Sequence, residues 1–205
     1  MKDNVKYPFF KKLLAKHSED EEQEDVETSL QAFIDDVRQI SELVRNDVKL
    51  YAPLRQCSKL EEITSTSAFW KVKFCLQKFL SLKACWQDEA LAIWCRILPE
   101  IRKDIPEIDF VASLGSNKTS NNEYVISEQR FRQILCSPNI DIFLSEILSC
   151  IRRLHGNVNV VSLLDYIFLW CRDNDGYAFG SKGIYQVRQT ANFIWSESFF
   201  SSRSK

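Results

Sequence analysis

The sequence contains few of the residues that interrupt helices, since glycine and proline occur only five times each in 205 residues. The alternation of apolar and polar residues that is typical of strands is also scarce. Hydrophobic residues make up 45% of the chain, which is enough to bury a core of ordinary size. We therefore expect an all-α protein, built as two small helical bundles that are joined by a polar loop and preceded by an N-terminal extension.

Long hydrophobic runs are absent too. The apolar stretches are a handful of residues long, far short of the roughly 20 that a membrane-spanning helix needs. Residues 1–17 contain lysines and aromatic side chains, but neither a long apolar region nor a small-residue cleavage site follows them, so they do not resemble a secretory signal. We expect no membrane partner and a cytoplasmic location.

The seven cysteines form no Cys-x-x-Cys pair, and any two of them are at least ten residues apart. With only two histidines in the chain, this pattern excludes the common zinc sites, and we expect neither a metal nor a cofactor. Most of the cysteines are embedded in apolar helical patterns. They are interpreted as buried reduced thiols, which are typical of a reducing cytoplasm.

Assembled catalytic motifs are missing as well. The chain has no glycine-rich phosphate loop followed by a lysine, no His-Glu-x-x-His and no nucleophile elbow. Cys136 and His155 could be drawn as a cysteine hydrolase, but both lie in apolar helical contexts. That alternative predicts a reactive thiol at Cys136. We expect the protein not to be an enzyme.

Charge is balanced over the whole chain but not along it. The net charge is −1, with an acidic excess in residues 1–62 and a basic excess in residues 63–205. Most of the acidic excess lies in the run Glu-Asp-Glu-Glu-Gln-Glu-Asp-Val-Glu over residues 19–27. Because nucleic-acid binding depends largely on neutralising phosphates, this balance favours binding alongside other subunits over high-affinity binding by the isolated chain.

Composition divides the chain into five segments. They are an N-terminal extension over 1–27, an N-terminal helical lobe over 28–112, a connector loop over 113–123, a C-terminal helical lobe over 124–200 and a tail over 201–205. The first 18 residues are expected to be loosely ordered, although a short amphipathic helix through Phe9, Phe10, Leu13 and Leu14 is an alternative. The serine-rich tail is expected to fray.

Apolar stripes at helical spacing predict the individual helices. They run over 28–48, 66–85, 88–98 and 138–156, after Asn159 as far as Cys171, and through 184–195. Ser127 is expected to cap a short helix, and Gly156 is expected to end a long one. Pro53 is expected to interrupt the chain before Arg55. Trp70 and Phe74 are expected to broaden the buried face of helix 66–85.

Several sequence motifs follow one another in a fixed order. In the centre, Ser-Leu-Gly at 113–115 is followed by a polar loop and then by Ser-Glu-Gln-Arg-Phe-Arg-Gln-Ile-Leu at 127–135. Asn46–Cys57 and Ala68–Lys71 precede these motifs, and Val158–Trp170 and Val187–Trp195 follow them. From about residue 30 to 200, this series resembles the CasB family, the small subunit of the type I-E CRISPR surveillance complex called Cascade.

The resemblance implies a non-catalytic subunit of a crRNA-guided antiviral complex. Proteins of this family lie as a pair along the complex, against its repeating backbone subunits and with its large subunit. Their basic residues steady the guide–target duplex and the displaced DNA strand. Since base pairing with the guide supplies sequence choice, such a subunit contacts phosphates rather than bases. The alternative is a helical adaptor whose ligand is purely protein.

The resemblance also selects candidate phosphate contacts. The primary candidates are Arg55, Lys118, Arg130, Arg132, Arg153 and Arg188, and the secondary candidates are Lys71, Lys78, Arg152 and Lys182. Arg130 and Arg188 fit the recurrent arginines of the family best. Lys71 and Lys78 are expected two turns apart on one helical side, as a phosphate track requires. A structural alternative exists for Arg152 and Arg153, which could serve the dipole of the preceding helix.

Overall fold

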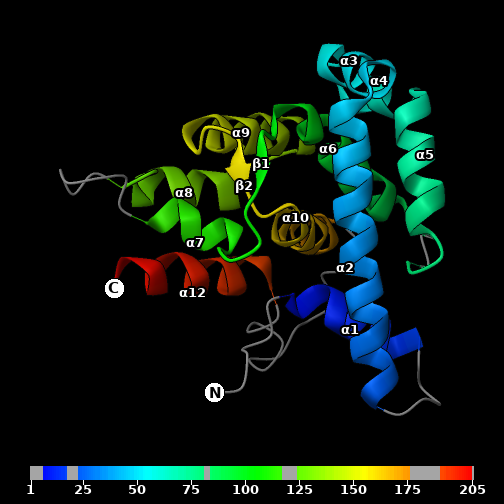
Figure 1. Cartoon of the computed structure of the whole chain (residues 1–205). Coiled ribbons are helices and arrows are strands. Elements are labelled where there is room, and N and C mark those ends of the chain that lie inside the picture. The colour runs from blue at the N-terminus through cyan, green and yellow to red at the C-terminus, as the bar shows by residue number, and fades with distance from the viewer. Residues whose placement is uncertain (1–6, 18–22, 81–83, 117–123, 176–189, 205) are drawn as a thin grey trace.

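The computed structural model describes residues 7–17, 23–80, 84–116, 124–175 and 190–204. These residues are helical apart from loops and one pair of two-residue strands, so the predicted all-α class is confirmed (Figure 1). None of the described helices combines the length and the apolar character that crossing a bilayer requires.

The elements follow the numbering of Figure 1. The helices are α1 (Pro8–His17), α2 (Gln23–Asn46), α3 (Val48–Gln56), α4 (Leu60–Thr64), α5 (Ser67–Leu76), α6 (Cys85–Ile97), η1 (Leu98–Glu100), α7 (Phe110–Gly115), α8 (Glu128–Leu135), α9 (Ile140–Arg153), α10 (Val160–Asn174) and α12 (Ala191–Arg203). The strands β1 (Lys103–Asp104) and β2 (Asn157–Val158) pair in parallel, with Lys103 opposite Asn157.

Helix α10 occupies the centre of the molecule (Figure 1). Its residues from Val160 to Cys171 are all buried, as expected of a helix that is apolar on every side. It packs on α6, α2, α1 and α12. The buried residues before and after the predicted connector form one connected core, so the segments predicted as two bundles share a single hydrophobic interior.

Helix α1 belongs to this core. The prediction that the first 18 residues are loosely ordered is therefore wrong for residues 8–17, and the alternative of a short amphipathic helix is correct. The ring centroid of Phe10 lies 4.6 Å from that of Phe33 and 5.3 Å from that of Phe168. The Phe10 N–H donates a hydrogen bond to the buried carboxylate of Asp165 over 2.9 Å. Aromatic burial and this cap across the chain fix the helix.

Residues 201–204 are also ordered, contrary to the expected fraying of the tail over 201–205. Helix α12 continues to Arg203, whose guanidinium donates to the Ile126 carbonyl over 2.7 Å. The same group lies 4.0 Å from the Tyr124 ring centroid and 4.5 Å from that of Phe199. These contacts hold the last turn against the residues that precede α8.

Two local predictions also need correction. Pro53 lies inside α3, and Arg55 is in the last turn of that helix, because burial of Leu50 and Leu54 offsets the hydrogen bond that proline removes. The start of the predicted connector is helical, since α7 ends at Gly115. A Cβ at Gly115 would lie 2.5 Å from the Phe199 carbonyl oxygen, so only glycine permits α12 to approach α7 this closely.

Asp109 joins three helices. It caps α7 by accepting from the Ala112 N–H over 2.9 Å. Its carboxylate also accepts from the hydroxyl groups of Ser162, Tyr166 and Ser198 over 2.8, 3.2 and 2.7 Å. Because two of these donors lie on α10 and one on α12, a single side chain connects α7 to both of its neighbours.

Replacing Asp109 with alanine is expected to lower the free energy of unfolding by about 2–3 kcal/mol, because the change removes a helix cap and leaves sheltered hydroxyl groups unpaired. Urea denaturation followed by circular dichroism measures the loss. Asp47→Ala is the matched control, since Asp47 caps α3 through the Lys49 N–H in an exposed position and should cost only about 1 kcal/mol. Equal losses in the two variants would show that Asp109 acts as a cap alone.

Candidate nucleic-acid interface

The pairing of β1 with β2 brings two basic segments together. The N–H groups of Arg102 and Lys103 donate to the Gly156 carbonyl over 2.8 and 3.2 Å. Gly156 has φ +74°, and a Cβ there would lie 2.7 Å from the Glu100 carbonyl oxygen, so glycine is needed for this approach. Arg102 and Lys103 therefore lie beside the turn that follows α9. The last helical turn of α9, immediately before it, carries Arg152 and Arg153.

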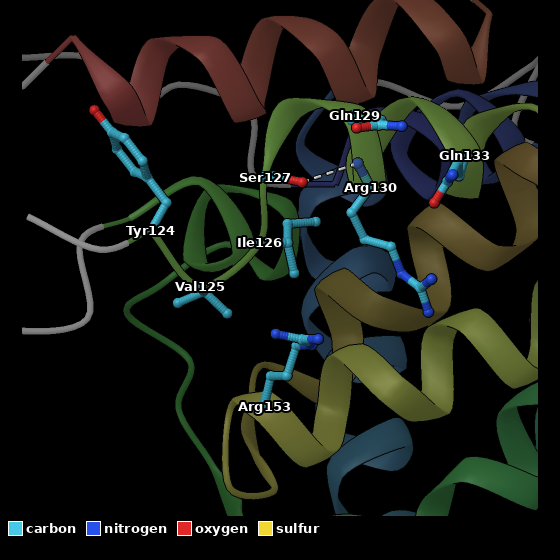
Figure 2. Close-up of a pocket in the computed structure, with 8 residues that line it drawn as sticks. All are labelled: Tyr124, Val125, Ile126, Ser127, Gln129, Arg130, Gln133 and Arg153. Carbon is cyan, nitrogen blue, oxygen red and sulfur yellow. Dashed lines mark hydrogen bonds between the residues drawn. The ribbon is translucent and has the colours of Figure 1, made fainter.

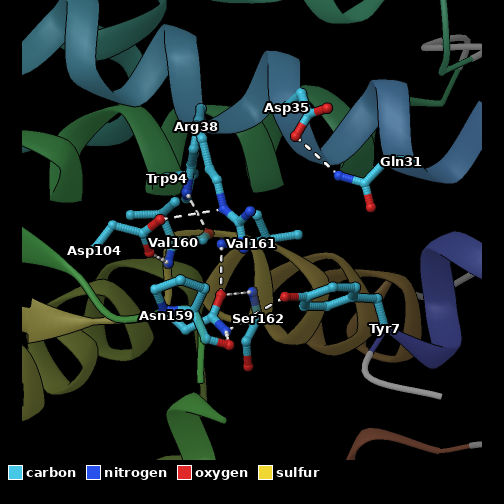
Figure 3. A network of polar contacts seen from close by, with 11 residues as sticks. Tyr7, Gln31, Asp35, Arg38, Trp94, Asp104, Asn159, Val160, Val161 and Ser162 are labelled. Carbon is cyan, nitrogen blue, oxygen red and sulfur yellow. Dashed lines mark hydrogen bonds and ion pairs between the residues drawn. The ribbon is translucent and has the colours of Figure 1, made fainter. Parts of the chain in front are cut away.

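A polar network fixes β1 against α10 (Figure 3). Asp104 forms an ion pair with Arg38 of α2 at 3.3 Å and accepts from the Val160 N–H over 3.0 Å. Asn159 caps α10, as the sequence predicted, and donates to the Pro106 carbonyl over 3.0 Å. These contacts fix the chain immediately after Arg102 and Lys103.

We call the group of cations in this region the basic ridge. Its members are Arg45, Arg102, Lys103, Arg152 and Arg153. Arg45 joins the group because its guanidinium donates to the Arg102 carbonyl over 3.4 Å. The other four side chains are exposed and form no ion pair with any residue that the structure describes. Sequence analysis did not select Arg45, Arg102 or Lys103.

Two acidic residues next to the basic ridge, Asp104 and Glu100, are engaged by other cations. Asp104 is paired with Arg38. Glu100 lies 3.7 Å from Arg96, whose side chain is only 11% exposed, and 4.0 Å from Arg55. The ridge therefore keeps an excess of positive charge although the whole chain is nearly neutral. Arg55 of α3 is 65% exposed and reaches this region through its contact with Glu100.

A hollow of about 460 Å³ lies beside the ridge (Figure 2). Its lining consists of Tyr124, Val125, Ile126, Ser127, Gln129, Arg130, Gln133 and Arg153. Arg153 comes from the end of α9 and Arg130 from the first turn of α8. A second hollow of about 590 Å³ shares Gln129 and Gln133 and is also lined by Arg132. Two of the predicted primary candidates thus line one hollow and a third lines its neighbour.

Helix α8 is fixed by contacts on several sides. The Ser127 hydroxyl accepts from the Arg130 N–H over 3.2 Å, which confirms the predicted cap (Figure 2). The Phe131 ring stacks on Phe199 of α12 at 3.9 Å between centroids. The Arg130 guanidinium pairs with Glu146 of α9 at 2.5 Å. Arg130 therefore clamps α8 to α9 and has less charge to offer a phosphate than its sequence position indicates.

The remaining arginines differ in how readily they can bind a phosphate. Arg132 is 71% exposed and pairs only with Glu128 one turn earlier, an interaction that contributes about 0.3–0.5 kcal/mol and is easily exchanged. Arg152 and Arg153 occupy the last turn of α9. A cation at this end of a helix interacts favourably with the helix dipole and is still free to bind an anion. Beneath them, burial raises the pKa of the Cys150 thiol to about 12, while Arg130 and Arg153 act in the opposite direction.

Two of the lysine candidates, Lys71 and Lys78, lie elsewhere. Helix α5 ends at Leu76 with Gln77 as its C-cap, so Lys78 lies beyond the helix and does not share one helical side with Lys71, contrary to prediction. Lys78 pairs with Asp36 of α2 at 2.6 Å. In Figure 1, α5 and α8 lie at opposite edges of the molecule. Lys118, Lys182 and Arg188 lie outside the described residues.

Cys136 and His155 are the two residues of the hydrolase alternative. Cys136 is exposed and lines the second hollow, and His155 is an exposed residue with φ 55° in the turn after α9. No hydrogen bond joins the two side chains. None of the seven cysteines is in a disulfide, and burial raises the pKa of Cys95 and Cys171. Within the described ranges, no cluster of three histidine, cysteine or carboxylate side chains could hold a metal ion.

The fold and this surface define an all-α protein with a basic ridge beside a polar hollow. No protein-family model matches the chain, and comparison with curated proteins and with solved structures yields no match.

Proposed function

We propose that this protein is the non-catalytic small subunit of a crRNA-guided type I-E Cascade complex. In this role it steadies the guide–target duplex and the displaced DNA strand by phosphate contacts that do not depend on sequence. The observation that supports the proposal best is the basic ridge, where Asp104 and Glu100 are paired with other cations and four ridge cations form no ion pair with any described residue. The sequence motifs that resemble the CasB family supply the particular complex.

The charge distribution explains why such a subunit would work as part of an assembly. A chain of net charge −1 with an acidic run near one end gains little long-range attraction to a polyanion. Backbone subunits, a large subunit and a second copy of the chain would place the ridge next to the nucleic acid and raise its effective concentration there. Free cysteines throughout the chain fit assembly in a reducing cytoplasm.

Changing Arg102, Arg152 and Arg153 together to glutamine is expected to weaken target binding by the assembled complex. If each residue neutralises one phosphate, the slope of log affinity against log salt should fall by about 2–3, since each contact contributes about 0.9. The sequence preference should stay the same, because the guide reads the target. The measurement is a salt titration of target binding, using the tagged chain expressed with its native neighbours.

The matched control changes three exposed cations that do not belong to the ridge, Lys12, Lys49 and Lys59, to glutamine. This variant has the same change in net charge, so an equal fall in slope would overturn the role of the ridge.

The purification itself tests the complex. A guide-sized RNA and a repeating backbone subunit should accompany the tagged chain.

A second candidate function is that of a helical protein–protein adaptor. The ion pairs of Arg130 with Glu146 and of Arg132 with Glu128 favour it, because in an adaptor these arginines would serve only to hold the fold. A stable protein assembly that purifies without nucleic acid, and that forms equally well with the ridge variant, would support the adaptor.

A further inference from the structure

Helix α5 exposes two aromatic side chains that sequence analysis placed on its buried face. Trp70 is 44% exposed and Phe74 is 58% exposed, so that prediction was wrong. The helix buries Ala68, Phe69, Val72 and Leu76 against its neighbours α2 and α6. Because these residues form the buried face, Trp70 and Phe74 lie on the outer side of α5, where no described element covers them.

The exposed side of α5 is a regular stripe. Ser67, Trp70, Lys71, Phe74 and Gln77 are all exposed and follow the spacing of one helical face. The ring centroids of Trp70 and Phe74 are 5.8 Å apart, with 37° between the ring planes. The buried ring of Phe69 meets Trp70 edge-on at 5.6 Å and supports it from behind. Two aromatic faces are thus presented side by side, one helical turn apart.

Charge distinguishes this stripe from an ordinary apolar patch. Helix α5 contains two lysines and no acidic residue. Lys71, next to Trp70, is exposed and has no ion pair with any residue of the described ranges. The Lys73 ammonium lies 5.2 Å from the Trp70 ring centroid and pairs with Asp88 of α6 at 2.7 Å. Lys71 therefore leaves one positive charge beside the two rings that no described acid balances.

Aromatic faces combined with an unpaired cation recognise single-stranded nucleic acid, because unpaired bases stack on the rings while the cation meets the phosphate backbone. Bases within a duplex already stack on one another and leave no face free for Trp70. A protein partner fits less well, since lysine is depleted at protein interfaces and here Lys71 borders the two rings.

We infer that Trp70, Lys71 and Phe74 form a binding platform for an unpaired stretch of nucleic acid, with bases stacked on the two rings and a phosphate at Lys71. We call this surface the α5 platform. It lies at the edge of the molecule opposite α8 (Figure 1), so it is separate from the basic ridge and its hollows. It also adds base stacking to the phosphate contacts proposed above.

Two oligonucleotides test the platform in the full chain. One is a short oligothymidylate strand, and the other has the same length but abasic residues throughout, so that only its phosphates remain. The natural chain is expected to bind the thymidylate strand about tenfold more tightly than the abasic strand. The double variant Trp70→Ala/Phe74→Ala should bind the two strands equally. Fluorescence anisotropy at low salt gives both affinities.

Three variants and one spectroscopic readout make the test decisive. Phe193→Ala removes an aromatic side chain on α12 that is 37% exposed and should retain the preference for thymidylate. Trp70→Phe keeps an aromatic face and should retain most of it. The Trp70 indole N–H signal in NMR spectra, assigned by its loss in Trp70→Phe, should shift when the thymidylate strand is added, even if binding is weak. Lys71→Gln should weaken both strands alike.

Three outcomes would overturn the inference. They are equal affinity of the natural chain for the two strands, unchanged thymidylate binding by the double alanine variant, and an unmoved Trp70 signal at millimolar strand. A signal that moves only with a purified partner subunit would reassign the platform to protein docking. None of these results depends on the salt response of the ridge variant, so failure of the α5 platform and failure of the proposed function are distinguishable.

Discussion

The Asp165→Asn variant is expected to become progressively more stable than the natural chain as the pH rises from about 4 to about 7, because the natural chain loses stability over this range. Asp165 is only 1% exposed. One carboxylate oxygen accepts the Phe10 N–H of α1, and the other has no hydrogen-bond partner. Burial raises the pKa of this carboxyl to about 7 and Asp109 raises it further, while the N–H groups of Phe10 and Phe9 and the charge of Arg172 lower it.

The direction of the effect follows from the two states of the chain. In the unfolded chain an aspartate has a pKa of about 3.9, so below pH 4 the group is protonated in both states and contributes nothing. Between about 4 and 7 only the folded state keeps the proton, and the natural chain loses stability as the pH rises. Above pH 7 both states are ionised, and the loss levels off at about 4 kcal/mol. Asparagine has no proton to lose.

Urea denaturation at a series of pH values tests this. The difference in unfolding free energy between Asp165→Asn and the natural chain should grow by about 1.4 kcal/mol per pH unit within the window. Asn139→Ala, which removes the uncharged cap of α9, is the control whose difference should not follow the pH in this way. A flat profile for Asp165→Asn would mean that the buried carboxyl keeps an ordinary pKa.

Replacing Phe10 with alanine is expected to lower the free energy of unfolding by about 3–5 kcal/mol. The ring is fully buried between Phe33 and Phe168 and also meets Phe9 at 5.5 Å. Its removal would leave a cavity in a core that joins α1, α2 and α10. Thermal or urea unfolding followed by circular dichroism measures the loss.

The control for this variant is Phe74→Ala, because Phe74 is 58% exposed and its removal should change stability by less than about 0.5 kcal/mol. If Phe10→Ala lost less than about 1 kcal/mol, α1 would be an appendage whose docking contributes little to the fold. That result would restore the original expectation of a loosely attached N-terminal extension.

Sequence signals predicted the features that depend on local chemistry. Ser127 and Asn159 cap the helices that they were expected to cap, and the stripe of α9 is buried as expected, because capping and helical periodicity act within a few residues. The place of α1 in the core was missed because Phe10 meets Asp165 and Phe168, which are distant in sequence. The exposure of Trp70 was missed because periodicity groups residues into faces without showing how many of those faces are covered.

The candidate interface was predicted only in part, for the same reason. Arg132 and Arg153 were selected from the sequence and line the two hollows. Arg102 and Lys103 were not selected, because their position beside α9 depends on the pairing of β1 with β2. The ion pair of Arg130 with Glu146 likewise joins two helices, and no pattern within α8 indicates it.

The docking of α1 also has a consequence for biosynthesis. The hydrogen bond from Phe10 to Asp165 joins residues that are 155 positions apart in the chain. At about 5–20 residues per second, the ribosome would deliver Asp165 roughly 8–30 s after Phe10. For that interval the side of α1 that packs on α10 has no partner, although Phe33 of α2 is already made, and it is open to chaperones and to other nascent chains. The yield of folded protein should therefore depend on elongation speed, whereas its equilibrium stability should not.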